Sequence, residues 1–428
     1  MKNLIFLFIA VVTWSLTSSC NNSSRQIKRF AEAPKIKAQD DDVSFEDYDD
    51  LFAYLLNSND IFTLKKQEEL IDSIQNIELK NLANSMVNFY FNKPQESNYY
   101  IKKLFRESTG NSGLENNMKR IMSENYRRLG YYDSAFYALK ELIKNPEISS
   151  DNDIKIASGL KNISMANIIA FDTSAIKLEK DSIFGLSIVS VHDSKKEEHE
   201  FILDTGAAYS TLLESDCKNF GIKIMADSLI FNGEFLKLGI APIVEIGKTK
   251  IKNAIFLIIP DSIGTISILN SHRKLNVIGL DILRKSDNVE ITETSLTFNK
   301  PTNYQTKALN NMAFEGGFII VNVNLVSETP FIFDTGSNVS FLCPIYENDL
   351  VSFEKGDTTI TVGGAFDVGE INPTYYYNVP IRVTDSLKVI PKLMVSSKHC
   401  PYGLLGKDVT ELFSKIILDF KNMTFLLE

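Results

Sequence analysis

FILDTGAAYSTL at residues 201–212 is matched later in the chain by FIFDTGSNVSFL at residues 331–342. In each stretch three apolar residues precede Asp-Thr-Gly, and a short apolar run of this kind predicts a buried β-strand. A second matched pair is NVIGLDILRKSDNVEI at 276–291 and GLLGKDVTELFSKIIL at 403–418, in which two apolar residues precede a glycine. The second half of the chain is therefore predicted to be an internal duplication whose copies each hold two equivalent apolar strands.

A single Asp-Thr-Gly would be weak evidence of function, since Asp and Gly are also common residues of β-turns. Two plain turns, however, do not explain why both copies share the downstream apolar-apolar-glycine segment. We therefore look for chemistry in the residues on which the copies agree, Asp204 and Asp334. Two carboxyl groups held together in a partly buried site cannot both ionise cheaply, so they share a proton. The charged member can then act as a general base toward a water, and the protonated member can donate to a carbonyl oxygen.

Residues 172–428 resemble the retropepsin and pepsin clan of aspartic proteases, in which Asp-Thr-Gly follows a strand inside each lobe. Val277-Ile278-Gly279 and Leu404-Leu405-Gly406 match the second motif of that clan. The resemblance implies a mainly β bilobal acid-protease fold, with lobe 1 over 172–300 and lobe 2 over 308–428. It also implies an endopeptidase that hydrolyses peptide bonds of a protein or peptide substrate and needs no metal or other cofactor.

The same resemblance implies that Asp204 and Asp334 are the catalytic pair, which activates one water. The residues expected to support them are Thr205, Gly206, Thr335, Gly336 and Ser337. The threonine hydroxyls are expected to bond across the lobe interface, and the glycines to leave room for the backbone near the carboxylates. Ser337 could donate a hydrogen bond to its neighbouring aspartate, which predicts that Asp334 is the more acidic partner.

Flap hairpins that cover substrate are expected around 231–239 in the first copy and around 361–369 in the second. Because one chain carries both copies, a single polypeptide can form the whole site. Exchange of lobes between two chains is the alternative assembly. The alternative function is a peptide-binding or scaffold protein without turnover, which is suggested by the first copy, where Ala208-Tyr209 replaces Asn338-Val339.

The first residues predict export. Residues 1–19 have the charge, apolar core and small residues of a signal peptide, and they precede Cys20. This pattern resembles the cleavage box of bacterial lipoproteins, which implies a lipid at Cys20, attachment to a membrane, and a periplasm-facing location in the bacterial cell envelope. Plain secretion and an uncleaved anchor are the alternatives. Residues 20–43 are polar and charged and predict a flexible tether.

Residues 44–150 predict a helical domain, because apolar residues recur at helical spacing and glycines are rare. The stretch from Leu129 to Ala135 resembles the turn of one tetratricopeptide helix pair, and a weaker copy is expected between Asn81 and Phe105. An unrelated small helical bundle is the alternative. Such a domain would recruit substrate, cover the cleft or bind a protein partner. The chain is thus predicted to be multidomain, with this N-terminal all-α domain followed by the pepsin- or retropepsin-like lobes.

Composition excludes some other functions. The 428 residues carry a formal charge of -9 and a pI near 5.2, which argues against a nucleic-acid partner. The chain has four histidines, and His199-Glu200 has no second histidine at zinc-protease spacing. Cys343 and Cys400 fall in the same copy and could form a disulfide in an oxidising compartment, whereas the cysteine spacing fits no zinc pattern.

Overall fold

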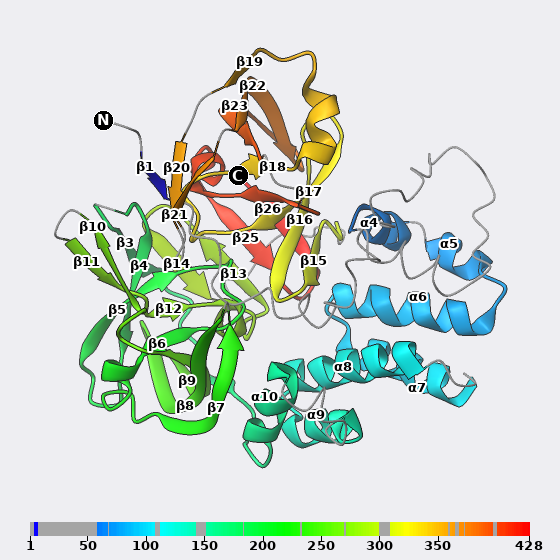
Figure 1. The fold of residues 1–428 in the computed structure, drawn as a ribbon, viewed down its shortest axis with the longest axis vertical. Coiled ribbons are helices and arrows are strands. Elements are labelled where there is room, and N and C mark those ends of the chain that lie inside the picture. Colours follow the sequence, from blue (N-terminus) through cyan, green and yellow to red (C-terminus); the bar gives the residue numbers. More distant parts are fainter. Residues whose placement is uncertain are drawn as a thin grey trace. The chain divides into compact units, whose positions relative to one another are not determined.

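The structure is a computed structural model that describes residues 4–6, 58–66, 68–107, 112–142, 151–182, 184–231, 233–268, 271–298, 309–357, 360–363, 368–371, 373–396 and 400–428. These residues form two compact units (Figure 1), Trp14–Ser164 and Met165–Glu428, and the second unit includes Met1–Thr13. Cys20 and the predicted tether lie outside the described residues, as does the predicted signal peptide apart from β1 (Leu4–Phe6). None of the described helices has the length and apolarity that crossing a membrane requires.

The first unit is helical. Its elements are α4 (Ser58–Lys66), α5 (Glu68–Ser73), α6 (Ile77–Tyr90), α7 (Pro94–Glu107), α8 (Ser112–Arg128), α9 (Tyr132–Leu139) and α10 (Asn152–Leu160). Asn76 caps α6, because its side chain accepts hydrogen bonds from the backbone N–H groups of Glu78 and Leu79. The turn between α8 and α9 contains Gly130 at φ +75°, a conformation that glycine adopts without steric cost.

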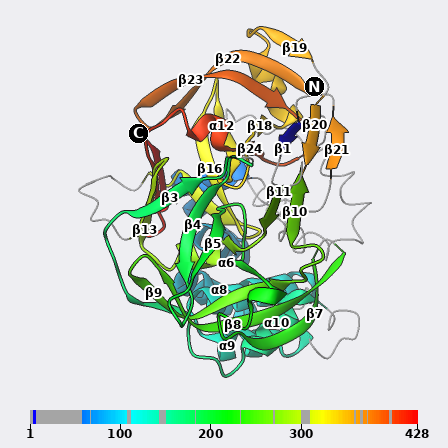
Figure 2. The same ribbon diagram turned by 90° about the vertical axis from the view of Figure 1, so that its left-hand side faces the viewer.

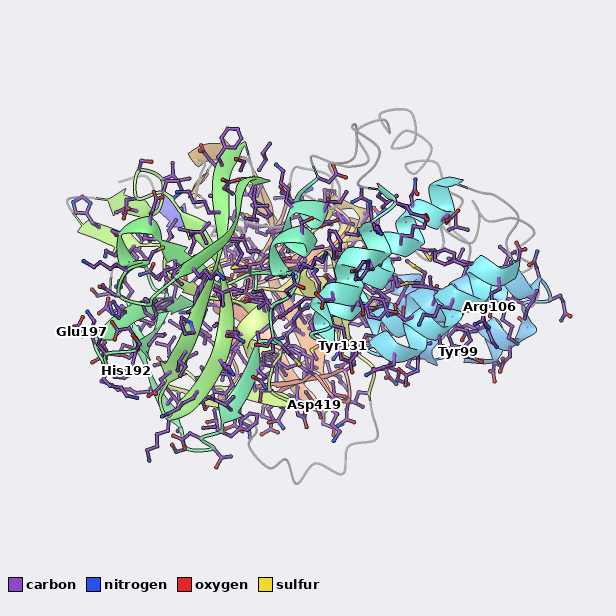
Figure 3. All side chains as sticks on the ribbon, turned by 90° about the horizontal axis from the view of Figure 1, so that it is seen from below. Tyr99, Arg106, Tyr131, His192, Glu197 and Asp419 are labelled. Atoms are coloured by element: carbon purple, nitrogen blue, oxygen red, sulfur yellow. A yellow bond between two sulfur atoms is a disulfide. The ribbon has the colours of Figure 1, made fainter. Side chains whose placement is uncertain are left out.

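Successive helices pack as pairs, α6 with α7 and α8 with α9. These pairs occupy the two places where the sequence predicted helix pairs, and their assignment as tetratricopeptide repeats stays a prediction. The helical unit also extends past residue 150, because Ile154 and Ala157 of α10 join Leu139 and Leu142 in one buried cluster. Tyr99 on α7 and Tyr131 before α9 are more than half exposed, and Figure 3 labels both.

Within its described residues, the second unit is mainly β and contains two large sheets. The first sheet has 13 strands: β2 (Asn167–Ala170), β3 (Ile176–Lys180), β4 (Ser187–His192), β5 (Glu198–Leu203), β6 (Thr211–Leu213), β7 (Lys223–Phe231), β8 (Glu234–Ile246), β9 (Thr249–Ile259), β12 (Val277–Ile278), β13 (Asn288–Ile291), β14 (Ser295–Phe298), β25 (Ile416–Asp419) and β26 (Thr424–Leu427). Its order is β26-β25-β13-β14-β3-β4-β5-β12-β6-β9-β8-β7, with β2 paired to β9.

The second sheet has eight strands: β15 (Met312–Glu315), β16 (Phe318–Asn324), β17 (Glu328–Phe333), β18 (Phe341–Leu342), β19 (Lys355–Asp357), β22 (Thr374–Val383), β23 (Ser386–Val395) and β24 (Gly403–Leu405). Smaller elements complete the unit: the hairpin β10 (Thr265–Ile268) and β11 (Ser271–Lys274), the hairpin β20 (Ile360–Gly363) and β21 (Val368–Ile371), and the short helices α11 (Leu280–Leu283) and α12 (Lys407–Thr410).

The duplication is visible in the strand pairing. In the first copy β12 runs parallel to β5, with Ile278 opposite Leu203, and in the second copy β24 runs parallel to β17, with Leu405 opposite Phe333. Each of these central strands also pairs with the strand that follows Asp-Thr-Gly, β6 or β18, and Figure 2 shows β24 beside β18. The predicted equivalence of the two apolar strands in each copy is therefore confirmed.

The C-terminal strands cross from the second copy to the first. β25 pairs with β13, so that Leu418 lies opposite Val289, and β26 follows at the edge of the sheet. Residues 416–419 are all buried, which is the burial expected of a strand covered on both faces. The two copies therefore share one sheet, although the sequence separates them near residues 300–308.

Hairpins occupy both regions in which flaps were expected. β7 and β8 pair antiparallel up to Phe231 opposite Glu234, inside the first predicted region, and β20 pairs antiparallel with β21 around the second. Strand β1 adds to β20 in parallel, and the residues between β20 and β21 lie outside the described ranges. The hairpins are therefore present where predicted, and their role as flaps stays a prediction.

Cys343 and Cys400 form a disulfide, with their Cα atoms 5.7 Å apart. The sequence left this pairing open, since it could not show that the two residues are close. The disulfide joins the end of β18 to the segment before β24, and these two strands are antiparallel neighbours in the second sheet. Cys217 is a free thiol.

Candidate active site

Asp204 and Asp334 occupy the same place in the two copies. Asp204 follows β5, and its backbone N–H donates to the carbonyl of Ile278 on β12 at 3.1 Å. Asp334 follows β17, and its N–H donates to the carbonyl of Leu405 on β24, also at 3.1 Å. The strand of the second motif therefore fixes the point at which each Asp-Thr-Gly loop leaves its sheet.

The two loops meet at their glycines. The N–H groups of Gly206 and Gly336 each donate to Oδ1 of the aspartate in their own loop at 2.8 Å. A β-carbon on Gly206 would lie 2.4 Å from Cγ of Asp334, and one on Gly336 would lie 2.5 Å from Cγ of Asp204. Only glycine fits at such a separation, so each carboxyl group packs directly against the other loop's backbone.

The threonines join the loops by four hydrogen bonds. Thr205 Oγ1 donates to the carbonyl of Phe333 at 3.1 Å and accepts the backbone N–H of Thr335 at 3.0 Å. Thr335 Oγ1 donates to the carbonyl of Leu203 and accepts the N–H of Thr205, both at 3.0 Å. The arrangement is the same in both directions, and all of these groups are buried, so the loops are held rigidly in register.

The electrostatics of the pair follow from burial. Asp204 is 7% exposed and Asp334 is 1% exposed. Burial raises the pKa of Asp204 above its ordinary value, and hydrogen bonds from Asp334 and the loop backbone oppose that rise. Burial raises the pKa of Asp334 further, because the charge on Asp204 and the hydrogen bond between the two groups add to it. Both carboxyl groups therefore resist ionisation, and the pair can hold one proton between them.

The prediction that Asp334 is the more acidic partner rested on a side-chain hydrogen bond from Ser337 that the structure does not contain. It assumed that the hydroxyl of Ser337 donates to Asp334, whereas Ser337 Oγ donates to the carbonyl of Val339 at 2.9 Å and accepts the Val339 N–H at 3.3 Å. The hydroxyl closes its own turn instead. Ser337 lowers the pKa of Asp334 only through its backbone N–H, as Gly336 also does, and the effect of burial is larger.

Sequence reasoning missed a second pair of carboxylates that supports the loops. Ser210 Oγ donates to Asp281 Oδ1 at 2.8 Å and accepts the N–H of Gly279 at 3.0 Å. In the second copy, Ser340 Oγ donates to Asp408 Oδ1 at 2.6 Å and accepts the N–H of Gly406 at 2.8 Å. A signal was present, because both copies carry serine at the same offset after Asp-Thr-Gly and aspartate at the same offset after the second-motif glycine.

The two-fold pattern is broken where the copies touch. Asn338 Nδ2 donates to the carbonyl of Phe184 at 2.6 Å, and Lys407 Nζ donates to the carbonyl of Gly185 and to Ser187 Oγ. The equivalent positions of the first copy are Ala208 and Leu280, which have no polar side-chain atoms. The second copy therefore contacts the β3–β4 turn of the first through two polar side chains. The first copy cannot make the equivalent contacts with the second, because Ala208 and Leu280 are apolar.

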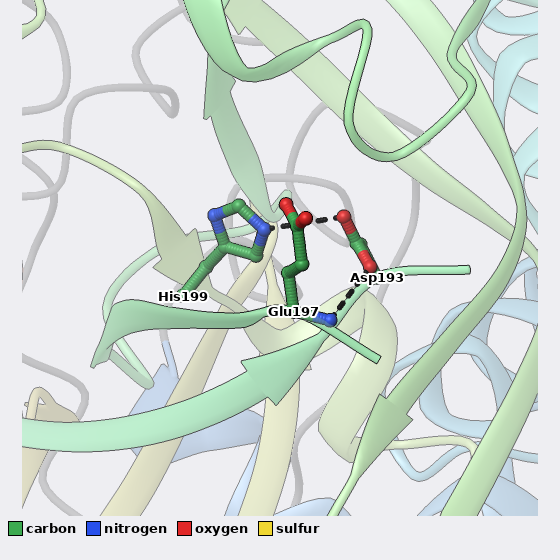
Figure 4. A group of neighbouring side chains, drawn as sticks. All are labelled: Asp193, Glu197 and His199. Atoms are coloured by element: carbon green, nitrogen blue, oxygen red, sulfur yellow. Dashed lines mark hydrogen bonds and ion pairs between the residues drawn. The ribbon is translucent and has the colours of Figure 1, made fainter. Parts of the chain in front are cut away.

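One group of residues in the described ranges brings together the atom types that bind metals: Asp193, Glu197 and His199 at the β4–β5 turn (Figure 4). Asp193 Oδ1 accepts the backbone N–H groups of Lys195 at 2.8 Å and Glu197 at 3.0 Å, and Oδ2 lies 3.4 Å from His199 Nε2. Through these contacts Asp193 stabilises the β4–β5 turn. Glu197 is exposed. His192 and Glu197 are labelled in Figure 3.

The arrangement of Asp204 and Asp334 can perform acid–base chemistry. A buried pair that shares one proton offers a carboxylate and a carboxylic acid side by side, which can accept a proton from a water and donate one to an oxygen. Each carboxyl group is oriented by a backbone donor from its own loop, so neither needs to reorganise during such a transfer.

No protein-family model matches this chain, and no curated protein does. Among solved structures the chain is similar to a retropepsin-like aspartic protease from Rickettsia conorii, at 18% identity and a TM-score of 0.23 over 30% of this chain and 92% of that one. It is also similar to the aspartic proteinase from Irpex lacteus, at 11% identity and a TM-score of 0.35 over 59% and 95% of the two chains. A third similar structure is Basic 7S globulin from soybean, at 8% identity and a TM-score of 0.36 over 60% and 94%. Because these values are low, the function proposed below rests on the chain's own residues.

Proposed function

We propose that this chain is an aspartic endopeptidase that hydrolyses peptide bonds with one water activated by Asp204 and Asp334. One observation carries the proposal: two duplicated loops bring two buried carboxyl groups together inside a symmetric set of hydrogen bonds. A structural ion pair would join opposite charges, whereas this site joins two acids that can hold one proton between them.

The proposed mechanism assigns the two protonation states. Asp204, the member with the smaller rise in pKa, is the carboxylate that removes a proton from the attacking water. Asp334, whose pKa burial and the Asp204 charge raise well above its ordinary value, is the acid that donates to the scissile carbonyl oxygen. The roles exchange when the tetrahedral intermediate collapses and the leaving amine takes a proton. The water, the two carboxyl groups and the substrate complete the reaction, so the proposal requires no metal or other cofactor.

The proposal extends to the rest of the chain on the strength of its sequence. Residues 1–19 would direct export, and a lipid at Cys20 would hold the protein in the bacterial cell envelope, facing the periplasm. The helical unit would bind a protein partner or recruit substrate. Labelling with a radioactive fatty acid tests the anchor, since Cys20→Ser should abolish incorporation and release the protein from membranes.

The experiment that tests the catalytic pair is cleavage of an unfolded protein by the wild type, Asp204→Asn and Asp334→Asn. Each substitution removes one carboxyl group with little change in volume, and we expect kcat/KM to fall by about 10²–10⁴-fold. Asp385→Asn, at the exposed turn between β22 and β23, is the matched control and should keep full activity. A transition-state inhibitor of aspartic proteases should block the wild type.

Two outcomes would contradict the proposal. If either Asp204→Asn or Asp334→Asn keeps wild-type activity, the pair does not perform the chemistry. If the folded wild type binds unfolded chains but cleaves none of them at any pH between about 3 and 8, the chain is instead the peptide-binding protein that the sequence left as an alternative.

A further inference from the structure

A cavity of about 850 Å³ lies against the loop that follows Asp334. The first copy contributes its β3–β4 turn, including Phe184 and Gly185, and the second copy contributes Val339, Tyr375, Lys392 and Met394. The cavity thus lies between the two copies, as the carboxyl pair does. The mechanism described above does not use it.

The chain connects the cavity to the candidate active site. Asn338, Val339 and Ser340 line the cavity, and they continue the loop that carries Asp334, Thr335 and Gly336. A substrate whose scissile bond lies at the carboxyl pair is an extended chain that advances about 3.3 Å per residue. The cavity therefore lies within reach of substrate residues a few positions from that bond.

The apolar walls of the cavity suit the carbon atoms of a side chain. Phe184 in the β3–β4 turn is almost fully buried, and Met394 on β23 is also buried. Methionine adapts to the shape of what it contacts, since its side chain is unbranched. Val339 packs against Tyr375 and Met394 and is partly buried. The walls can therefore cover the methylene groups of a long side chain.

Two of the four charged residues on the walls form ion pairs with neighbours. Lys180 pairs with Glu411 at 2.8 Å, Asp181 pairs with Arg273, and Asp408 accepts the hydroxyl of Ser340. Lys392 differs, because within the described residues it has no carboxylate partner. Its ammonium group lies 3.6 Å from the centroid of the Tyr375 ring. Within the described residues the cavity therefore presents one cation without an ion pair, Lys392, and one carboxyl group without one, Asp408, whose pKa is raised by burial.

Tyr375 provides a second, independent feature. Its side chain is 4% exposed, and within the described residues its hydroxyl has no hydrogen-bond partner. A buried hydroxyl without an acceptor is unfavourable, so a ligand that supplies an acceptor oxygen near this ring gains more than it would in water. The ring also holds Lys392 in place by a cation–π contact. A cation and a hydroxyl donor together favour a carboxylate.

We propose that this cavity binds a carboxylate of the substrate, with Lys392 as the ionic contact and the hydroxyl of Tyr375 as the hydrogen-bond donor. The carboxylate belongs to a glutamate side chain near the scissile bond, whose methylene groups pack on Phe184 and Met394. This inference rests on the proposed endopeptidase function and adds a preference for acidic residues on one side of the cleaved bond.

The test uses a peptide that the protein cleaves, with an amidated C-terminus and no acidic residue. Glutamate or glutamine is placed at each of about four positions on either side of the cleaved bond, and kcat/KM is measured for every pair. We expect glutamate to be preferred by about 10-fold at one or two positions on one side only. The preference should decrease as salt increases, because salt screens a partly exposed ionic contact.

The variants separate this cavity from other causes of the preference. Lys392→Met should bring the ratio of glutamate to glutamine close to one, and Tyr375→Phe should lower it by a smaller factor. Lys388→Met is the matched control, since Lys388 is an exposed lysine on the same strand that does not line the cavity, and it should keep the wild-type ratio. Restoring a free C-terminal carboxylate to the glutamine peptides distinguishes a terminal carboxylate from a side chain as the ligand.

The inference is wrong if glutamate and glutamine peptides are cleaved equally, if Lys392→Met keeps the preference, or if a free C-terminus alone reproduces it. Failure of the proposed function would look different, because no peptide would be cleaved. In that case fluorescence anisotropy with labelled peptides still tests the cavity. Asp334→Asn should bind the glutamate peptide more tightly than the glutamine peptide. The double variant Asp334→Asn with Lys392→Met should bind the two peptides equally.

Discussion

Thr205 and Thr335 each use one hydroxyl to donate and to accept a hydrogen bond across the two loops. We expect Thr205→Val to leave a buried carbonyl of Phe333 and a buried N–H of Thr335 without partners. The free energy of unfolding should fall by about 2–4 kcal/mol, and kcat should fall with it because the carboxyl groups lose their alignment. Urea denaturation and single-turnover kinetics measure the two effects.

Thr205→Ser keeps the hydroxyl and is the matched control. It should lose less than about 1 kcal/mol, since only a methyl group is removed. Equal losses in the serine and valine variants would show that packing of the methyl group, and not the hydrogen bonds, holds the loops together.

Glu315 gives the stability of the protein a dependence on pH that does not involve the candidate active site. Burial raises its pKa from 4.5 to about 7, although the hydroxyl of Tyr402 donates to it and opposes the rise. Between these two values the unfolded carboxyl group has lost its proton and the folded one keeps it. The folded state binds more protons there, so the free energy of unfolding falls as pH rises from about 4.5 to 7, by up to about 3 kcal/mol.

We expect Glu315→Gln to remove this contribution. The free energy of unfolding of the variant minus that of the wild type should be higher at pH 8 than at pH 4. This change should occur between about pH 4.5 and 7. Chemical denaturation at several pH values measures it, and Glu354→Gln, an exposed glutamate before β19, is the control. A difference that stays constant with pH would mean that the carboxyl group of Glu315 ionises freely in the folded protein.

At the scale of the elements, the disulfide ties the ends of two short strands in the second copy. β18 and β24 contain only 2 and 3 residues, so their pairing contributes few hydrogen bonds of its own. The disulfide closes a loop with a sequence separation of 57 residues, which corresponds to about 4 kcal/mol of chain entropy in the unfolded state.

We expect Cys343→Ser with Cys400→Ser to lower the free energy of unfolding by about that amount, and a reducing agent to have the same effect on the wild type. Cys217→Ser is the control, because Cys217 is not in the disulfide. Since β24 holds the backbone N–H of Asp334 through Leu405, activity should decrease before the protein unfolds completely. If the disulfide is reduced and the free energy of unfolding stays unchanged, this prediction is wrong.

At the scale of the whole molecule, one chain supplies both halves of the site, and β25 and β26 of the second copy complete the sheet of the first. We therefore expect specific activity to be independent of protein concentration. We also expect a mixture of Asp204→Asn and Asp334→Asn to remain inactive after co-refolding, because each chain forms one defective site. Recovery of activity in the mixture would show that chains exchange lobes, since exchange would bring two wild-type loops together.

Much of the site was predictable from the amino-acid sequence. The duplicated loops around Asp204 and Asp334, the equivalent apolar strands beside them and the change from helix to strand all leave short, local patterns of apolar and polar residues. The duplication strengthened each pattern, because a feature present in both copies is unlikely to be a chance turn. The serine and aspartate pairs behind the loops carry the same signal, because they lie at equal offsets in the two copies.

The tertiary structure decided which of these segments meet. The crossing of β25 to β13, the disulfide, the cavity between the β3–β4 turn and β23, and the hydroxyl of Ser337 turning to Val339 instead of Asp334 all depend on contacts between distant segments or on the direction of one bond. Such contacts leave no periodic pattern in the chain, since they are selected by how the two copies pack and not by local preference. The protonation of the pair belongs here too, because it follows from burial and from the distance between two carboxyl groups that lie far apart in sequence.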